Sequence, residues 1–125
     1  MPRLEPRNVL GGALEACSIA PMTGFYRDGC CNTGHEDRGI HTICAEVTEA
    51  FLAFSASRGN DLTRPLAGGL FPGLKPGDRW CLCAGRWIEA WRAGKAPRVI
   101  LRATHEETLA MVDLETLKKY AVDLS

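Results

Sequence analysis

Apolar residues recur at helical spacing between residues 42 and 58. The positions that share one face there are Ile43, Val47, Ala50, Phe51 and Phe54. Gly59 follows, at a point where a left-handed C-terminal cap commonly ends a helix. The pattern therefore predicts a helix over 42–58.

Residues 79–84 (RWCLCA) admit two interpretations with different chemistry. In a strand, alternation places Cys81 and Cys83 on one face and their apolar neighbours on the other. In the first turn of a helix capped by Asp78, two residues rotate by about 200°, so the two sulfurs would diverge. We favour the strand, because a Trp-Cys-Leu-Cys run suits a pleated surface better than a helix start.

The segment that follows has the pattern of a scaffold. Residues 84–93 carry large apolar side chains at helical spacing and end at Gly94, which predicts a second helix. The tryptophans, including Trp80, are most simply core residues. Residues 99–102 predict a buried strand, and strand, helix, strand units usually pair their strands in parallel through a right-handed crossover.

Two short helices are predicted near the C-terminus. Thr104 and Glu107 have the spacing of a capping box, and Asp113 is placed to cap a last helix over 114–121. His105 follows the expected cap, so we interpret it as solvated helix surface.

Two long irregular segments, 18–41 and 60–77, connect these elements. Glycine, proline, asparagine or aspartate interrupts both at short intervals, so only 25–27 could form a short strand in the first. Irregular stretches beyond about 15 residues in a compact domain are usually functional or disordered. The aromatic residues and cysteines of 18–41 favour an ordered loop. The second segment is expected to pack through Leu70, Phe71 and Leu74.

Together these elements predict an α+β fold. We expect one compact domain over residues 1–125, with its core at 8–120, built from a small mixed sheet, about four helices and two long irregular loops. A chain of 125 residues has the commonest size of a single domain.

Composition narrows the possible partners. Fifteen basic and fifteen acidic residues cancel, and no dense Lys/Arg block is present, so we expect no nucleic-acid partner. The first eight residues mix charges with prolines and lack the apolar core of a signal peptide. No later stretch approaches the roughly 20 apolar residues that cross a bilayer. We therefore expect a cytoplasmic protein without a membrane partner.

That expectation governs how the six cysteines are interpreted. Stable disulfides are uncommon where thiol reductants dominate, and a chain of this length can fold without them. A disulfide framework is therefore disfavoured, and the thiols are expected to be reduced. Metal binding, thiol reactivity and plain packing remain as alternatives, since free cysteine is among the most buried residue types.

Four strings of rare residue types are similar to a known bacterial family. They are GFYRDGCCNTG at 24–34, HTICAEVTEAF at 41–51, RGNDL at 58–62 and FPGLKPGDRWCLCAGRW at 71–87. These strings resemble the family catalogued as domain of unknown function 2237, and the resemblance extends from residue 8 to about residue 120. It implies a shared single-domain fold, and it implies no activity, substrate, cofactor or catalytic residue.

A thiolate metal site, of the zinc type, is the leading hypothesis. Zinc takes thiolate and imidazole ligands from two or more segments. The pool of candidate ligands is Cys30, Cys31, Cys44, Cys81 and Cys83. Cys17 is a weaker candidate. Paired Cys-x-x-Cys motifs are absent, and adjacent cysteines are awkward ligands of one ion.

A thiol-dependent enzyme or redox protein is the competing hypothesis. In the predicted helix 42–58, Cys44 falls in the first turn, where the positive end of the helix dipole stabilises a thiolate. His41 lies one turn earlier and could accept the proton. Cys30 or Cys31 could resolve an oxidised Cys44.

A binding module with inert, buried cysteines is the third hypothesis. Polar loop residues could hold a small polar ligand, or could simply close the loops through turn hydrogen bonds and ion pairs. The candidates are Arg27, Asp28, Asn32, Asp78 and Arg79. A protein partner would instead contact apolar loop residues, of which Leu66, Leu70 and Phe71 are the candidates.

Overall fold

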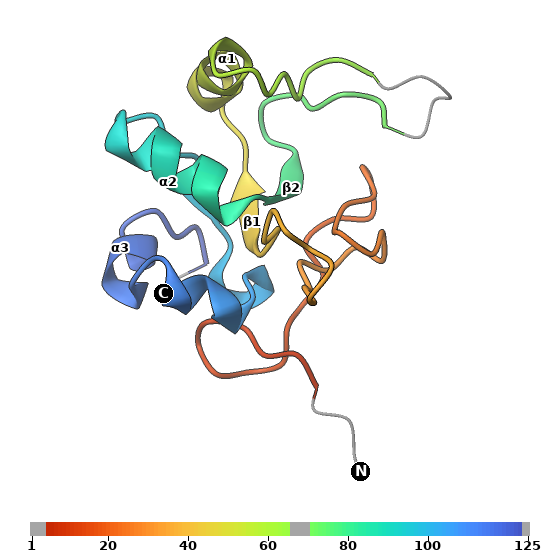
Figure 1. The fold of residues 1–125 in the computed structure, drawn as a ribbon, viewed down its shortest axis with the longest axis vertical. Coiled ribbons are helices and arrows are strands. Elements are labelled where there is room, and N and C mark those ends of the chain that lie inside the picture. Colours follow the sequence, from red (N-terminus) through yellow and green to blue (C-terminus); the bar gives the residue numbers. More distant parts are fainter. Residues whose placement is uncertain (1–4, 66–70, 124–125) are drawn as a thin grey trace.

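A three-stranded antiparallel sheet lies at the centre of the fold (Figure 1). The computed structural model describes residues 5–65 and 71–123. The strands are β1 (Ile43–Glu46), β2 (Arg79–Leu82) and β3 (Arg98–Val99). The α-helices of the described residues are α1 (Glu49–Ser57), α2 (Ala84–Arg92) and α3 (Leu114–Lys118). Two 3-10 turns lie between β3 and α3, η1 (Leu101–Ala103) and η2 (Glu106–Ala110).

The predicted α+β class is confirmed, with two corrections to its details. The strand order is β2-β1-β3, and β1 is antiparallel to both neighbours. β2 and β3 therefore run in the same direction, but they do not pair as predicted, because β1 lies between them. Three α-helices are present in the described ranges rather than about four, since residues 106–110 form a 3-10 turn.

The predicted helix 42–58 is wrong in its first part. Ile43, Cys44 and Ala45 are fully buried in β1, the central strand, with neighbours on both faces. The helix begins only after Thr48, whose hydroxyl accepts a hydrogen bond from the Phe51 N–H at 3.1 Å. Apolar residues on both faces of a short central strand can mimic helical spacing, so the pattern could not separate the two.

The strand interpretation of residues 79–82 is confirmed, and its side chains alternate as predicted. Trp80 and Leu82 belong to the large apolar core, which also contains the buried faces of α1 and α2. Cys81 belongs to a second, smaller cluster with Cys44 and Ile100. The sheet thus has one face in a conventional core and another face lined by cysteine.

The second face is covered by the N-terminal segment 5–41, which contains no helix. In Figure 1 this segment, coloured red to orange, lies on the opposite side of the sheet from α2 and α3. Asn8 anchors its beginning: the side-chain amide donates to the Ala13 and Arg102 carbonyls at 3.0 and 3.1 Å. The Val9 N–H donates to the Thr104 carbonyl at 3.0 Å. Hydrogen bonds to residues 102 and 104, far away in the sequence, thus help to attach a segment that has no helix of its own.

The second loop packs as expected where it is described. Phe71 and Leu74 are buried, and the Phe71 ring lies 4.9 Å from the Trp80 ring between centroids. Phe71 is therefore a core residue, and its predicted role in an exposed contact surface is wrong. Leu66 and Leu70 lie outside the described residues. No helix in the described parts of the chain is long and apolar enough to cross a bilayer.

His105 is buried rather than solvated, contrary to prediction. Its side chain is the N-cap of η2, because Nδ1 accepts a hydrogen bond from the Glu107 N–H at 3.0 Å. Burial lowers the pKa of His105, and the nearby charges of Glu107 and Glu106 only partly oppose that effect. The fold therefore favours the neutral imidazole.

This burial predicts a stability that falls with acidification. A depressed pKa in the folded state means that the contribution of His105 is complete above the unfolded value, about 6.5, and is lost as pH falls below it. We expect the urea midpoint to drop between pH 7.5 and pH 5.5. His105→Asn keeps a capping acceptor without a titrating group, so its midpoint should drop less. Equal drops in the two proteins would contradict the assignment.

Candidate functional site

Cys44 of β1 and Cys81 of β2 lie directly opposite each other on the loop-covered face of the sheet. Neither N–H points at the other strand's cysteine. The Cys44 N–H donates to the Thr104 hydroxyl at 3.1 Å, and the Cys81 N–H donates to the Thr23 hydroxyl at 2.8 Å. In antiparallel sheets, such non-hydrogen-bonded pairs bring opposite side chains closest together.

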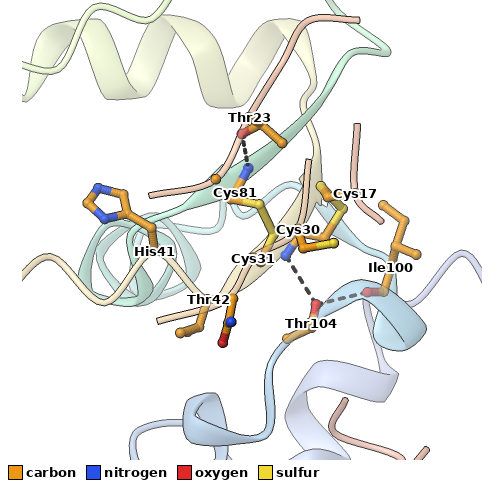
Figure 2. The surroundings of a disulfide bond; sticks show 12 residues. Cys17, Thr23, Cys30, Cys31, His41, Thr42, Cys81, Ile100 and Thr104 are labelled. Carbon is orange, nitrogen blue, oxygen red and sulfur yellow. Dashed lines mark hydrogen bonds between the residues drawn. A yellow bond between two sulfur atoms is a disulfide. The ribbon is translucent and has the colours of Figure 1, made fainter. Parts of the chain in front are cut away.

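The N-terminal segment places two more cysteines against this pair. Cys17 forms a disulfide with Cys44, and Cys31 forms a disulfide with Cys81. The Sγ atoms of Cys17, Cys31 and Cys81 all lie within 4.8 Å of one another. All four residues are at most 5% exposed. Figure 2 shows Cys17, Cys31 and Cys81 close together.

A short folded stretch between Cys17 and Cys31 holds the two loop cysteines in position. The Cys17 N–H donates to the Gly29 carbonyl at 2.7 Å, and the Gly29 N–H donates to the Thr23 carbonyl at 3.0 Å. Gly29 has a φ of 88°, and a Cβ there would press on Ile19 and on the Ser18 carbonyl. Glycine is required at this position, because an L side chain is strained at that φ and lacks space.

The disulfides correct the expectation that all thiols are free. That expectation depended on compartment and chain length, and neither decides whether two sulfurs meet in the fold. Of the five proposed metal ligands, Cys31, Cys44 and Cys81 meet at this site. Cys17, the weaker candidate, completes the cluster. We call these four residues, Cys17, Cys31, Cys44 and Cys81, the four-cysteine cluster.

Cys30 and Cys83 are outside the four-cysteine cluster and are free thiols. Burial raises the pKa of Cys30, and the carboxylate of Asp28 raises it further. Cys83 is the N-cap residue of α2, and its Sγ donates to the Gly39 carbonyl at 2.7 Å. β2 ends at Leu82, so Cys83 does not share a strand face with Cys81 as predicted.

The pairing of Cys44 with His41 has a different setting from the one predicted. Cys44 lies inside a strand, fully buried and disulfide-bonded, and not in the first turn of a helix. His41 instead lines a cavity of about 380 Å³ together with Cys83. His41 therefore shares a cavity with Cys83, while Cys44 belongs to the four-cysteine cluster.

Asp37, which the sequence analysis did not single out, is the partner of His41. Its Oδ1 lies 2.6 Å from His41 Nδ1, and its Oδ2 accepts hydrogen bonds from the His41 N–H and the Thr33 hydroxyl at 2.9 and 3.0 Å. Burial opposes ionisation of this carboxyl, but these hydrogen bonds outweigh it and hold the Asp37 pKa below its ordinary value. An aspartate four residues before a histidine in a turn-rich loop was the available signal.

The five polar residues proposed as ligand contacts are dispersed. Arg27 lines the cavity that contains His41, whereas Asp28 and Asn32 line a separate, wider hollow. Asp78 accepts a hydrogen bond from the Lys75 N–H at 2.9 Å and closes a turn. Arg79 lies 3.9 Å from a carboxylate oxygen of Glu46.

The two disulfides should contribute separately to stability. Cys17–Cys44 closes a loop of 27 residues and Cys31–Cys81 one of 50 residues. We expect that changing either pair to alanine lowers the free energy of unfolding by roughly 3–4 kcal/mol, with the longer loop costing slightly more. Guanidinium denaturation without reductant measures this. Changing both Cys30 and Cys83 to alanine is the matched control and should lower the free energy of unfolding by less. Equal decreases in the control and in the disulfide variants would argue against the two disulfides.

Comparison with known proteins gives a family and no curated relative. No curated protein matches the chain. The profile of one family, described as an uncharacterized protein conserved in bacteria, matches residues 7–121. This range includes all six cysteines, both disulfides and the Asp37–His41 pair. The chain belongs to the domain of unknown function 2237 family.

Proposed function

We propose that the four-cysteine cluster is a redox-linked metal site. In the reduced protein its thiolates hold one Zn²⁺, and in the oxidised protein they form the two disulfides. The observation that carries the proposal is the close approach of three sulfurs, those of Cys17, Cys31 and Cys81, within 4.8 Å, with Cys44 bonded to one of them.

The spacing of the sulfurs suits a tetrahedral thiolate site. Zinc binds thiolate at about 2.3 Å, so the sulfurs of a tetrahedral site lie about 3.8 Å apart. Sulfurs from different disulfides already lie within 4.8 Å. Once each disulfide opens, its two sulfurs need to separate, while Cys17 draws toward Cys31 and Cys81 by about an ångström and Cys44 turns toward the same point from its place beside Cys17. Side-chain rotation can supply such a shift without unfolding the sheet.

The placement of the ligands supports a role for metal in the reduced protein. Cys44 and Cys81 come from the sheet, and Cys17 and Cys31 come from the segment that covers it. Reduction alone would leave that segment, which has no helix, attached by local hydrogen bonds and a small apolar cluster. A metal bound to the same four sulfurs restores the link, because ligation couples binding free energy to folding.

The interconversion balances in electrons and protons. A dithiol reductant delivers two electrons and two protons to each disulfide and leaves as its own cyclic disulfide. Zn²⁺ then displaces the four thiol protons to solvent. In the reverse direction, one hydrogen peroxide oxidises each pair of thiolates to a disulfide, takes two protons from solvent and is reduced to two water molecules, and Zn²⁺ is released.

Metal binding by the reduced protein tests the proposal. Protein made without a histidine tag is reduced anaerobically, exposed to Zn²⁺, desalted and analysed for metal. We expect about one equivalent of zinc, released on addition of peroxide. Co²⁺ in place of Zn²⁺ should show the visible absorption of a tetrahedral thiolate complex, which reports the ligand type directly.

Serine variants identify the ligands. Cys31→Ser and Cys81→Ser should each lose most of the bound metal, because each removes a sulfur from the centre of the site. Cys30→Ser and Cys83→Ser remove the two half-buried thiols outside the four-cysteine cluster, and these variants should bind metal like the parent protein. Reduced protein that takes up no metal, folded or not, would disprove the proposal. So would metal that depends on Cys30 or Cys83.

A further inference from the structure

We propose that the cavity lined by Arg27, His41 and Cys83 is a second site, which binds a small anionic molecule and attacks its electrophilic carbon through the Cys83 sulfur. This site is independent of the four-cysteine cluster and of metal. In it Cys83 is the nucleophile, His41 the base, Asp37 a positioning residue and Arg27 the anion-binding group.

The cavity has the size and lining of a small-molecule site. Its volume is about 380 Å³, within the range of roughly 300–1,000 Å³ that ligand pockets occupy. Apolar walls come from Phe25, Leu62, Trp80 and Leu82, and the polar groups converge from different segments. Binding sites commonly combine apolar walls with a few placed polar groups in this way.

The Cys83 thiol and the His41 imidazole, which both line this cavity, both lie against Gly39. The Cys83 Sγ donates to the Gly39 carbonyl at 2.7 Å. The His41 ring rests against the same residue so closely that a Cβ on Gly39 would lie 2.5 Å from Cε1 and 3.1 Å from Nε2. Both reactive groups therefore contact one small residue, and a side chain at position 39 would displace the imidazole.

Asp37 sets the imidazole tautomer that proton transfer needs. Its side chain is fully buried, and its Oδ1 lies within hydrogen-bonding distance of His41 Nδ1, at 2.6 Å. With the carboxylate ionised, Nδ1 carries the proton and Nε2 is left as the acceptor. The exposed fraction of the His41 side chain is 38%, so the imidazole is open to solvent. The Asp37–His41 pair thus supplies a base and its orienting carboxylate, and in the proposed reaction the Cys83 thiol turns from the Gly39 carbonyl to His41 Nε2.

Arg27 supplies a positive charge without a carboxylate partner. No acidic side chain in the described residues lies within 4.0 Å of its guanidinium, which stacks over Trp80 at 5.4 Å and donates to the Gly24 carbonyl at 3.3 Å. Its backbone φ is 56°, a conformation that non-glycine residues rarely adopt. Residues with such strained backbone angles are common at functional sites. A guanidinium without a carboxylate partner can bind the carboxylate or phosphate group of a ligand.

The reaction follows from these placements. His41 Nε2 takes the proton from the Cys83 thiol as the sulfur attacks the electrophilic carbon. The carbon–sulfur bond forms while the bond to the leaving group breaks, and the leaving group departs with that electron pair. The proton then passes from Nε2 to solvent. Arg27 holds the anionic group of the substrate throughout.

Two alkylating reagents of nearly equal size test the site. Iodoacetate is anionic and iodoacetamide is neutral; both transfer a two-carbon group to sulfur and release iodide. With the oxidised protein at neutral pH, mass spectrometry of peptides measures labelling at Cys83, and Cys30 is the internal reference thiol. We expect Cys83 to react at least about tenfold faster than Cys30. We also expect Cys83, relative to a free thiol, to favour iodoacetate.

Three variants separate the assigned roles. Arg27→Gln should slow the reaction with iodoacetate more than the reaction with iodoacetamide and so remove the preference for iodoacetate. His41→Gln should slow both reagents by about tenfold or more. Asp37→Asn should lower the limiting rate at saturating iodoacetate without weakening the binding of iodoacetate. A purely structural role for Asp37 would not lower the rate while leaving the binding unchanged. Intact disulfides and unchanged circular dichroism establish that each variant is folded.

The outcomes that would overturn the proposal are distinct. If Cys83 were labelled no faster than Cys30, Cys83 would not be an activated nucleophile. If the Arg27→Gln change slowed labelling of Cys83 by both reagents equally, Arg27 would not be an anion-binding group. Neither result bears on the four-cysteine cluster, because its cysteines are disulfide-bonded in this experiment and its metal is measured separately.

Discussion

The covalent attachment of the N-terminal segment to the sheet is the constraint on which the rest of the structure depends. Ordering an irregular chain costs about 1–2 kcal/mol per residue in backbone entropy, and residues 5–41 have no helix to offset it. The cluster on this face contains only Ile100 and Ala103 besides its cysteines. Two cross-links at the centre of the face reduce the entropy lost on folding, and local hydrogen bonds order the remainder.

The same attachment positions the cavity. The N-terminal segment 5–41 contributes Gly24, Arg27 and His41 to the cavity. β2 contributes Trp80, and Cys83 comes from the start of α2. Cys81 contributes to the cavity wall while its sulfur is bonded to Cys31. The two proposed sites therefore share a scaffold, although they use different sulfurs and different chemistry.

Local patterns predicted the elements whose environment is simple. The strand at 79–82, the helix α2 and the cap Asp113 at α3 have one buried face or a short-range signal. The Thr48 cap at α1 was missed, because the predicted helix 42–58 began too early. The central strand β1 is buried on both sides, so its apolar residues carry no period that separates strand from helix. His105 was misplaced because its burial depends on segments distant in sequence, such as Thr42, whose carbonyl accepts from the His105 N–H at 2.9 Å.

By itself the sequence determined the α+β class, the single domain and the family, and it indicated that cysteine and histidine carry any chemistry. Spacing along the chain could not determine which sulfurs meet. Cys30 is a free thiol, whereas the adjacent Cys31 is disulfide-bonded. Cys17 bonds to Cys44 across a separation of 27 residues. Tertiary structure decided this, because the register of β1 against β2 brings Cys44 beside Cys81 and the folding of the covering segment selects their partners. Such contacts depend on the position of each residue in space, which local propensity does not encode.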